Sequence, residues 1–72
     1  MPPAMRDVPI RDDTIRLGQA LKLSGLADSG GEARSLVERG AVSVNGEVET
    51  RRGRQLHRGD VVALGDDTVR IA

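Results

Sequence analysis

The spacing of apolar residues changes at Gly40, and this change constrains the fold more than any other feature of the chain. Before Gly40 the apolar positions recur at helical intervals, and after it they alternate with polar ones, as in a strand with one buried face. Glycine is also the residue that most often ends a helix in the left-handed conformation. A helix over residues 30–39 followed by a strand over residues 41–44 is therefore predicted, with these buried positions: Ala33, Leu36, Val37, Val42 and Val44.

Local signals define both ends of this unit. Ser29 and Glu32 have the spacing of a capping box, in which the serine hydroxyl accepts a hydrogen bond from the backbone three residues on. Asn45-Gly46 follows the predicted strand, and this dipeptide favours a two-residue type I′ hairpin turn. The returning strand is predicted over residues 47–50.

A shorter helix is predicted earlier in the chain, over residues 15–24. Asp12, Asp13 and Thr14 precede it, and such residues favour a helix N-cap. Gly25 follows it as a stop signal. Its expected buried stripe consists of Leu17, Ala20 and Leu21.

The remainder of the chain predicts further strands joined by turns. Residues 50–55 are predicted as a basic loop, residues 56–60 as a turn, and residues 61–64 and 68–71 as strands. With 72 residues the chain has room for one domain. We assign residues 1–14 to an N-terminal leader, with a possible edge strand at Val8-Pro9-Ile10, and residues 15–72 to an α+β domain, two helices packed on a small, mostly antiparallel sheet.

Composition excludes several classes of function. The chain has no Cys and a single His, His57, so thiolate chemistry and multi-histidine metal sites are not expected. No spacing suggests a catalytic triad or a phosphate-binding loop. No apolar run is long enough to cross a bilayer, and no secretory segment is recognisable. A soluble, cytoplasmic, non-enzymatic protein without metal or cofactor is predicted.

Charge is unevenly distributed although the net charge is zero. Residues 34–58 carry six Arg against three Glu, whereas the segments on either side are acidic overall. The densest cluster is Arg51, Arg52 and Arg54, which no acid follows before Asp60. These three side chains are expected to repel one another in the isolated protein and to favour a polyanion.

From Arg16 onward the sequence resembles the S-four type RNA-binding domain, named after a protein of the small ribosomal subunit. The family pattern begins with Arg-Leu, found here as Arg16-Leu17, and continues thirteen residues later in the run Ser29-Gly30-Gly31-Glu32-Ala33-Arg34-Ser35-Leu36-Val37-Glu38-Arg39-Gly40-Ala41-Val42-Ser43-Val44-Asn45-Gly46. A basic loop and the turn Gly59-Asp60 complete it. The chain departs from the pattern at Gly18, where the family usually has Asp, and at Gly30, where it usually has Arg.

The resemblance implies an αL-type RNA-binding motif. In this motif the second predicted helix and the basic loop after the Asn45-Gly46 hairpin contact RNA. Backbone N–H groups at an open helix start can also bind an anion, so Gly30 and Gly31 are included. The predicted RNA-binding residues are Arg16, Ser29, Gly30, Gly31, Arg34, Asn45, Arg51, Arg52 and Arg54. Structural roles remain open for several of them: Ser29 as a cap, Arg34 as a partner of Glu38, and Arg16 as a partner of Asp12 or Asp13.

The absence of aromatic residues indicates the mode of binding. Proteins that recognise single-stranded RNA stack bases on Phe, Tyr or Trp, and this chain has none. The predicted partner is therefore a structured RNA, ribosomal or transfer RNA, bound through its phosphates by a monomer that does not interact with membranes. The alternative is an adaptor that docks on a ribosomal or other protein.

Overall fold

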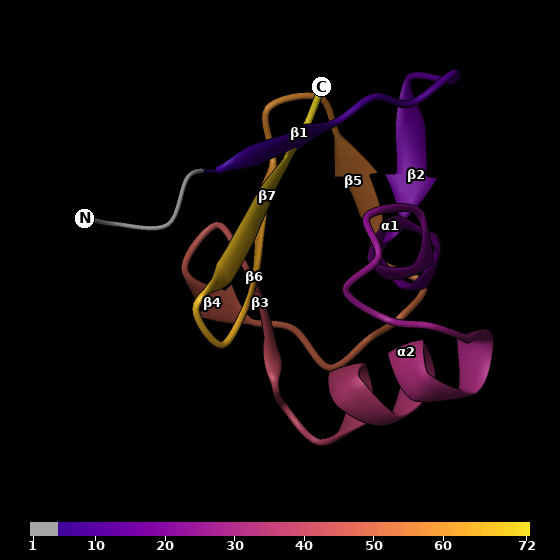
Figure 1. Cartoon of the computed structure of the whole chain (residues 1–72), viewed down its shortest axis with the longest axis vertical. Coiled ribbons are helices and arrows are strands. Elements are labelled where there is room, and N and C mark those ends of the chain that lie inside the picture. Colours follow the sequence, from indigo (N-terminus) through magenta and orange to yellow (C-terminus); the bar gives the residue numbers. More distant parts are fainter. Residues whose placement is uncertain (1–4) are drawn as a thin grey trace.

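Two helices and two sheets make up the chain in its computed structural model, which describes residues 5–72 (Figure 1). The first four residues of the predicted leader lie outside that range. In chain order the elements are β1 (Arg6–Val8), β2 (Thr14–Arg16), α1 (Leu17–Leu23), α2 (Gly30–Glu38), β3 (Val42–Val44), β4 (Glu47–Val48), β5 (Gln55–His57), β6 (Val61–Leu64) and β7 (Asp67–Ile71).

The larger sheet has five strands in the order β1-β7-β6-β3-β4. Its strands pair antiparallel except for β1, which lies parallel to β7 at one edge. The smaller sheet is the antiparallel pair β2 and β5. The predicted α+β class, with two helices on a mostly antiparallel sheet, is confirmed.

The core is aliphatic and lies between the sheets and the helices. Alternating positions in β3, β6 and β7 direct valines to the same face, and the predicted helical stripes of α1 and α2 pack against them. The largest fully buried side chains are Leu17, Leu21, Val37, Val42, Val44, Leu56, Val62, Val69 and Ile71. All the core positions predicted in the two helices and in β3 are buried.

The unit around α2 forms as its local signals predict. The Ser29 hydroxyl accepts a hydrogen bond from the Glu32 backbone N–H at 3.1 Å. Gly40 ends the helix region with a φ of +77°, and Asn45 and Gly46 both adopt positive φ, as a type I′ turn requires.

Replacing Ser29 by Ala is expected to lower the free energy of unfolding by about 1 kcal/mol, because the N-cap bond at Glu32 is lost. Urea titration measures this difference. A Ser29→Thr variant keeps the hydroxyl and is expected to retain most of the stability. Equal losses in both variants would contradict a capping role.

The start of the first helix was predicted wrongly. Thr14–Arg16 is strand β2, and α1 begins only at Leu17, with Arg16 at the N-cap position and no side-chain cap bond. The loop between β4 and β5 supplies the cap instead: the carbonyls of Arg54 and Arg52 accept hydrogen bonds from the N–H groups of Leu17 and Gly18, both at 2.9 Å. A distant backbone segment thus replaces the Asp-Asp-Thr cap.

Three other strands differ from the prediction by more than one residue. The returning strand predicted over residues 47–50 is only the two-residue strand β4, Glu47–Val48. Leu56 lies in the strand β5, opposite Ile15 of β2, rather than in a turn. The edge strand predicted at Val8–Ile10 lies two residues earlier, at Arg6–Val8, and leaves Pro9 outside the ladder. The last contact between β1 and its neighbour β7 is the hydrogen bond from the Ala72 N–H to the Val8 carbonyl at 2.9 Å, where β7 has already ended at Ile71.

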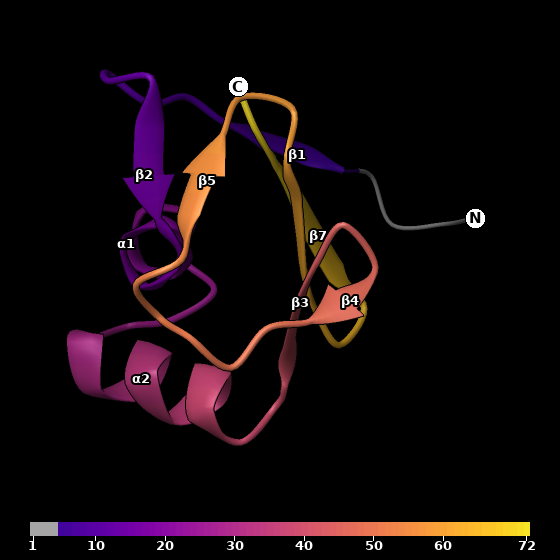
Figure 2. The ribbon, with the colours of Figure 1, turned by 180° about the vertical axis from the view of Figure 1, so that it is seen from behind.

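The segment between β4 and β5 connects the larger sheet to both helices. Figure 2 shows this orange segment leaving β4, passing α2 and reaching the start of α1 before it enters β5. Because its carbonyls cap α1, its position is fixed relative to the helix pair. This brings the arginine-rich residues 51–54 next to α1 and α2.

Candidate functional site

A cleft of about 300 Å³ lies where α1, α2 and the segment after β4 meet. Four cationic residues line it: Arg16 at the end of β2, directly before α1, Lys22 of α1, Arg34 of α2, and Arg52 of the segment after β4. Of the described residues, no Asp or Glu lines the cleft. The remaining lining residues are small or neutral: Gly18, Gln19, Gly30, Ala33 and Gly53. Residues far apart in sequence thus form one positively charged hollow.

The backbone of the cleft is fixed by the contact between α1 and the loop. Arg52 accepts a hydrogen bond from Gly18 through its carbonyl, so its side chain starts at the rim of the cleft. A Cβ at Gly18 would lie 3.6 Å from both the Cβ and the carbonyl oxygen of Arg52, an ordinary contact distance. A Cβ at Gly30 would meet nothing within 4 Å. The two glycines therefore leave space beside the cations.

The cations of the cleft are mostly without acidic partners. Within residues 5–72 no ion pair involves Arg16, Lys22 or Arg52. Neither acid considered as a partner of Arg16 pairs with it: Asp13 pairs with Arg58 at 3.2 Å, and no ion pair among the described residues involves Asp12. Arg34 does pair with Glu38 one turn later, at 2.9 Å, but both side chains are more than half exposed. Exposed pairs of this kind are worth little in water, so Arg34 remains available to a ligand.

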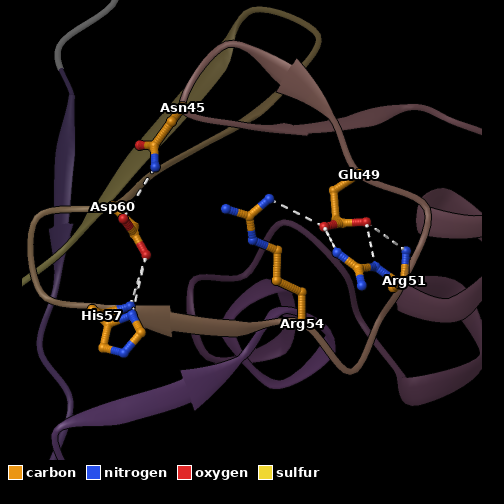
Figure 3. A network of polar contacts seen from close by, with 6 residues as sticks. All are labelled: Asn45, Glu49, Arg51, Arg54, His57 and Asp60. Carbon is orange, nitrogen blue, oxygen red and sulfur yellow. Dashed lines mark hydrogen bonds and ion pairs between the residues drawn. The ribbon is translucent and has the colours of Figure 1, made fainter.

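The other two arginines of the loop belong to a different cluster (Figure 3). Both oxygens of Glu49 accept from Arg51, and Oε1 also accepts from Arg54 Nη1 at 3.1 Å. The hydrogen bonds from Arg51 lower the pKa of Glu49 to about 2, so the carboxylate is charged at neutral pH. The expectation that the three loop arginines repel one another is therefore wrong for Arg51 and Arg54, because both pair with the carboxylate of Glu49 between them.

Asn45 lies in the hairpin, outside the cleft. Its side-chain amide donates to Asp60 Oδ1 at 3.1 Å, and its oxygen accepts from the Val61 backbone N–H at 2.9 Å. Asp60 also accepts from the His57 backbone N–H, and this bond lowers the pKa of Asp60. Figure 3 shows this network apart from the Glu49 cluster. These contacts of Asn45 stabilise the turn between β3 and β4 and attach it to the start of β6.

The two glycines at the start of α2 line different grooves. Gly30 lines the cleft, whereas Gly31 lies with Ser35 and Arg39 in a second groove along the outer side of α2, which Arg34 also lines. Ser29 acts as the cap described above. Of the nine predicted residues, the structure brings four together in the cleft: Arg16, Gly30, Arg34 and Arg52.

Lys22 is a cleft residue that the sequence interpretation did not include. It follows Gly18 by four positions and therefore lies on the same side of α1, away from the buried stripe. The sequence shows that this side of α1 is polar. Its proximity to residues 52 and 53, however, depends on where the loop lies. No sequence signal locates the loop there.

Two further findings concern the described residues only. No group of three or more His, Cys, Asp or Glu side chains in residues 5–72 is arranged to hold a metal ion. Neither α1 nor α2 has the length and apolar character needed to cross a membrane.

The structure is that of a small α+β domain, in which two helices pack on a mixed sheet and a basic cleft lies beside the helices. The sequence profile of the S4 domain matches residues 8–72. The chain belongs to this family, as the resemblance over roughly Arg16–Leu64 predicted.

Relatives of similar size share most of the chain. A protein of Bacillus subtilis (strain 168) named probable ribosome maturation protein RlbA is 48% identical over 58 residues, which are 78% of this chain and 82% of that protein. A protein of Escherichia coli (strain K12) named putative RNA-binding protein YbcJ is 33% identical over 57 residues, 79% of this chain and 81% of that protein.

Among solved structures, the 30S ribosomal protein S4e from Thermoplasma acidophilum has a similar fold. The TM-score is 0.63 at 23% identity, and the match covers 83% of this chain and 32% of that chain. At this identity the likeness supports the fold alone.

Proposed function

We propose that this chain binds structured RNA, without catalysis, and that the RNA phosphates lie against the cleft between α1, α2 and residues 52–53. The observation that carries the proposal is the convergence of four cationic side chains on one hollow lined by no acid among the described residues. Arginine is suited to this role because its guanidinium contacts two phosphate oxygens at once.

The relatives support the class of ligand. One is named a putative RNA-binding protein and another a probable ribosome maturation protein. We extend this to a monomer that acts on ribosomal or transfer RNA in the cytoplasm. Since the chain has no aromatic residue, bases have no aromatic ring on which to stack, and recognition rests on phosphate geometry and shape.

Gly30→Asp gives a test in which binding and stability move in opposite directions. Gly30 lines the cleft with open space beside it, and the new carboxylate would lie one turn before Arg34 on α2, where it opposes phosphate binding. At the same time an acid replaces glycine in the first turn of α2, which favours the helix. We expect affinity for transfer RNA to fall by at least about 5-fold at about 0.1 M salt, with unchanged or higher stability.

Gly30→Ala is the matched control, because it adds the Cβ without the charge. It is expected to keep the wild-type affinity and to stabilise the helix. Filter binding at several salt concentrations and urea titration measure the two quantities. If Gly30→Asp binds transfer RNA as well as Gly30→Ala does, phosphate does not occupy the cleft, and the cleft is not the RNA-binding site.

A further inference from the structure

Glu49 is a buried acid in the most basic part of the chain, and the site described above does not use it. Its side chain is only 8% exposed, although it lies between β4 and the arginine-rich loop. Its Oε2 accepts from both the backbone N–H and the Nε of Arg51, at 3.1 and 3.2 Å. Its Oε1 accepts from Arg51 Nη2 and Arg54 Nη1. Four hydrogen bonds to one carboxylate fix its position in the loop.

These bonds hold the loop from one side while α1 holds it from the other. The carboxylate binds the backbone at Arg51, and the carbonyls of Arg52 and Arg54 accept from the first N–H groups of α1. The Arg54 N–H also donates to the Arg51 carbonyl at 3.2 Å, which closes a turn. Arg52 lies inside this turn and is the loop arginine that lines the cleft.

We propose that Glu49 is a positioning residue that makes RNA binding selective, by binding Arg51 and Arg54 and leaving Arg52 directed to the cleft. This inference rests on the proposed function. Three unpaired arginines on a loop would attract any polyanion, because counterion release depends on charge and hardly on shape. With two of them paired to Glu49, the cationic contacts come from side chains at fixed places around the cleft, which suits a folded RNA better than a flexible one.

The first test compares two neighbouring arginines that carry the same charge. Arg51→Gln is expected to change affinity for transfer RNA by less than about 2-fold, because Arg51 is bound to Glu49 and lies outside the cleft. Arg52→Gln is expected to weaken it by about 5-fold or more and to lower the salt slope by about one unit. Both side chains are exposed, so both variants are expected to fold. Equal losses of affinity would overturn the inference.

The second test removes the acid itself. Glu49→Gln is expected to bind poly(U) more tightly than the wild type, because two arginines are released, and to lose preference for transfer RNA over poly(U). Glu47→Gln is the matched control: it has the same change in charge, two residues away on the exposed part of β4. If both variants have the same ratio of transfer RNA to poly(U) affinity, Glu49 has no part in selectivity.

Hydrogen exchange gives a readout of position that does not depend on RNA. Glu49→Gln is expected to speed exchange at the Leu17 and Gly18 amides, which donate to the loop, relative to the Val62 and Val69 amides of the larger sheet. A uniform change across all four amides would indicate a general loss of stability and would contradict a positioning role.

The outcomes separate this inference from the proposed function. If Gly30→Asp and Arg52→Gln both leave transfer RNA affinity unchanged, the cleft is not the binding site. If both variants weaken binding, and Arg51→Gln weakens it as much as Arg52→Gln does, the cleft is the binding site but Glu49 does not have the proposed role.

Discussion

Replacing Arg16, Arg34 and Arg52 together by Gln is expected to weaken binding to transfer RNA by about 100-fold at about 0.1 M salt. Each lost charge-assisted contact is worth about 1 kcal/mol or more, and three of them correspond to roughly two powers of ten. The three side chains line the same cleft from β2, α2 and the loop. The slope of log affinity against log salt concentration is expected to fall by about three units, one for each phosphate contact.

A control variant separates the cleft from net charge. Arg6, Arg11 and Arg70 are exposed and lie on or next to the β1 edge of the sheet, outside the cleft. Replacing all three by Gln changes the net charge by the same amount and is expected to weaken binding by less than about 5-fold. Electrophoretic shifts at three salt concentrations measure both variants. Similar losses in the two variants would mean that bulk charge rather than the cleft determines binding.

Leu56→Ala is expected to lower the free energy of unfolding by about 3–5 kcal/mol, in the upper part of the range for large-to-small core changes. Leu56 is fully buried and lies opposite Ile15, where the smaller sheet packs into the core. For a domain of this size such a loss is a large part of the total stability, so much of the variant is expected to be unfolded at physiological temperature. Thermal and urea unfolding followed by circular dichroism measure it.

Val48→Ala removes a similar apolar group from an exposed position and is the control. Val48 is 66% exposed on β4, and its loss is expected to change stability by less than about 0.5 kcal/mol. A cost below about 1 kcal/mol for Leu56→Ala would contradict the burial of β5 and the second sheet.

The difference between Leu56 and the α2 unit shows which parts of the fold the sequence predicts. Ser29, Gly40 and Asn45-Gly46 act on residues a few positions away, so their cap, stop and turn form as predicted. β2 and β5 have three residues each, too few for a periodic pattern, and they pair across a separation of about forty residues. Only the tertiary structure reveals such strands.

The candidate site divides in the same way. Arg16 and Arg34 were predicted from the family pattern, Gly30 from the open start of the helix, and Arg52 from the basic cluster. The sequence does not distinguish Arg52 from Arg51 and Arg54, because that difference depends on the burial of Glu49. Lys22 was missed because its place in the cleft depends on how the loop caps α1.

The most direct test of the cleft is a titration of the labelled protein with a short RNA stem-loop, followed by amide chemical shifts. Six glycines report on two regions: Gly18, Gly30 and Gly53 line the cleft, whereas Gly46, Gly59 and Gly65 lie in turns of the sheet. We predict that the amides of the first three shift and that those of the last three do not. Shifts confined to the turn glycines, or no shift at saturating RNA, would contradict binding at the cleft, and the second result would favour a protein partner instead.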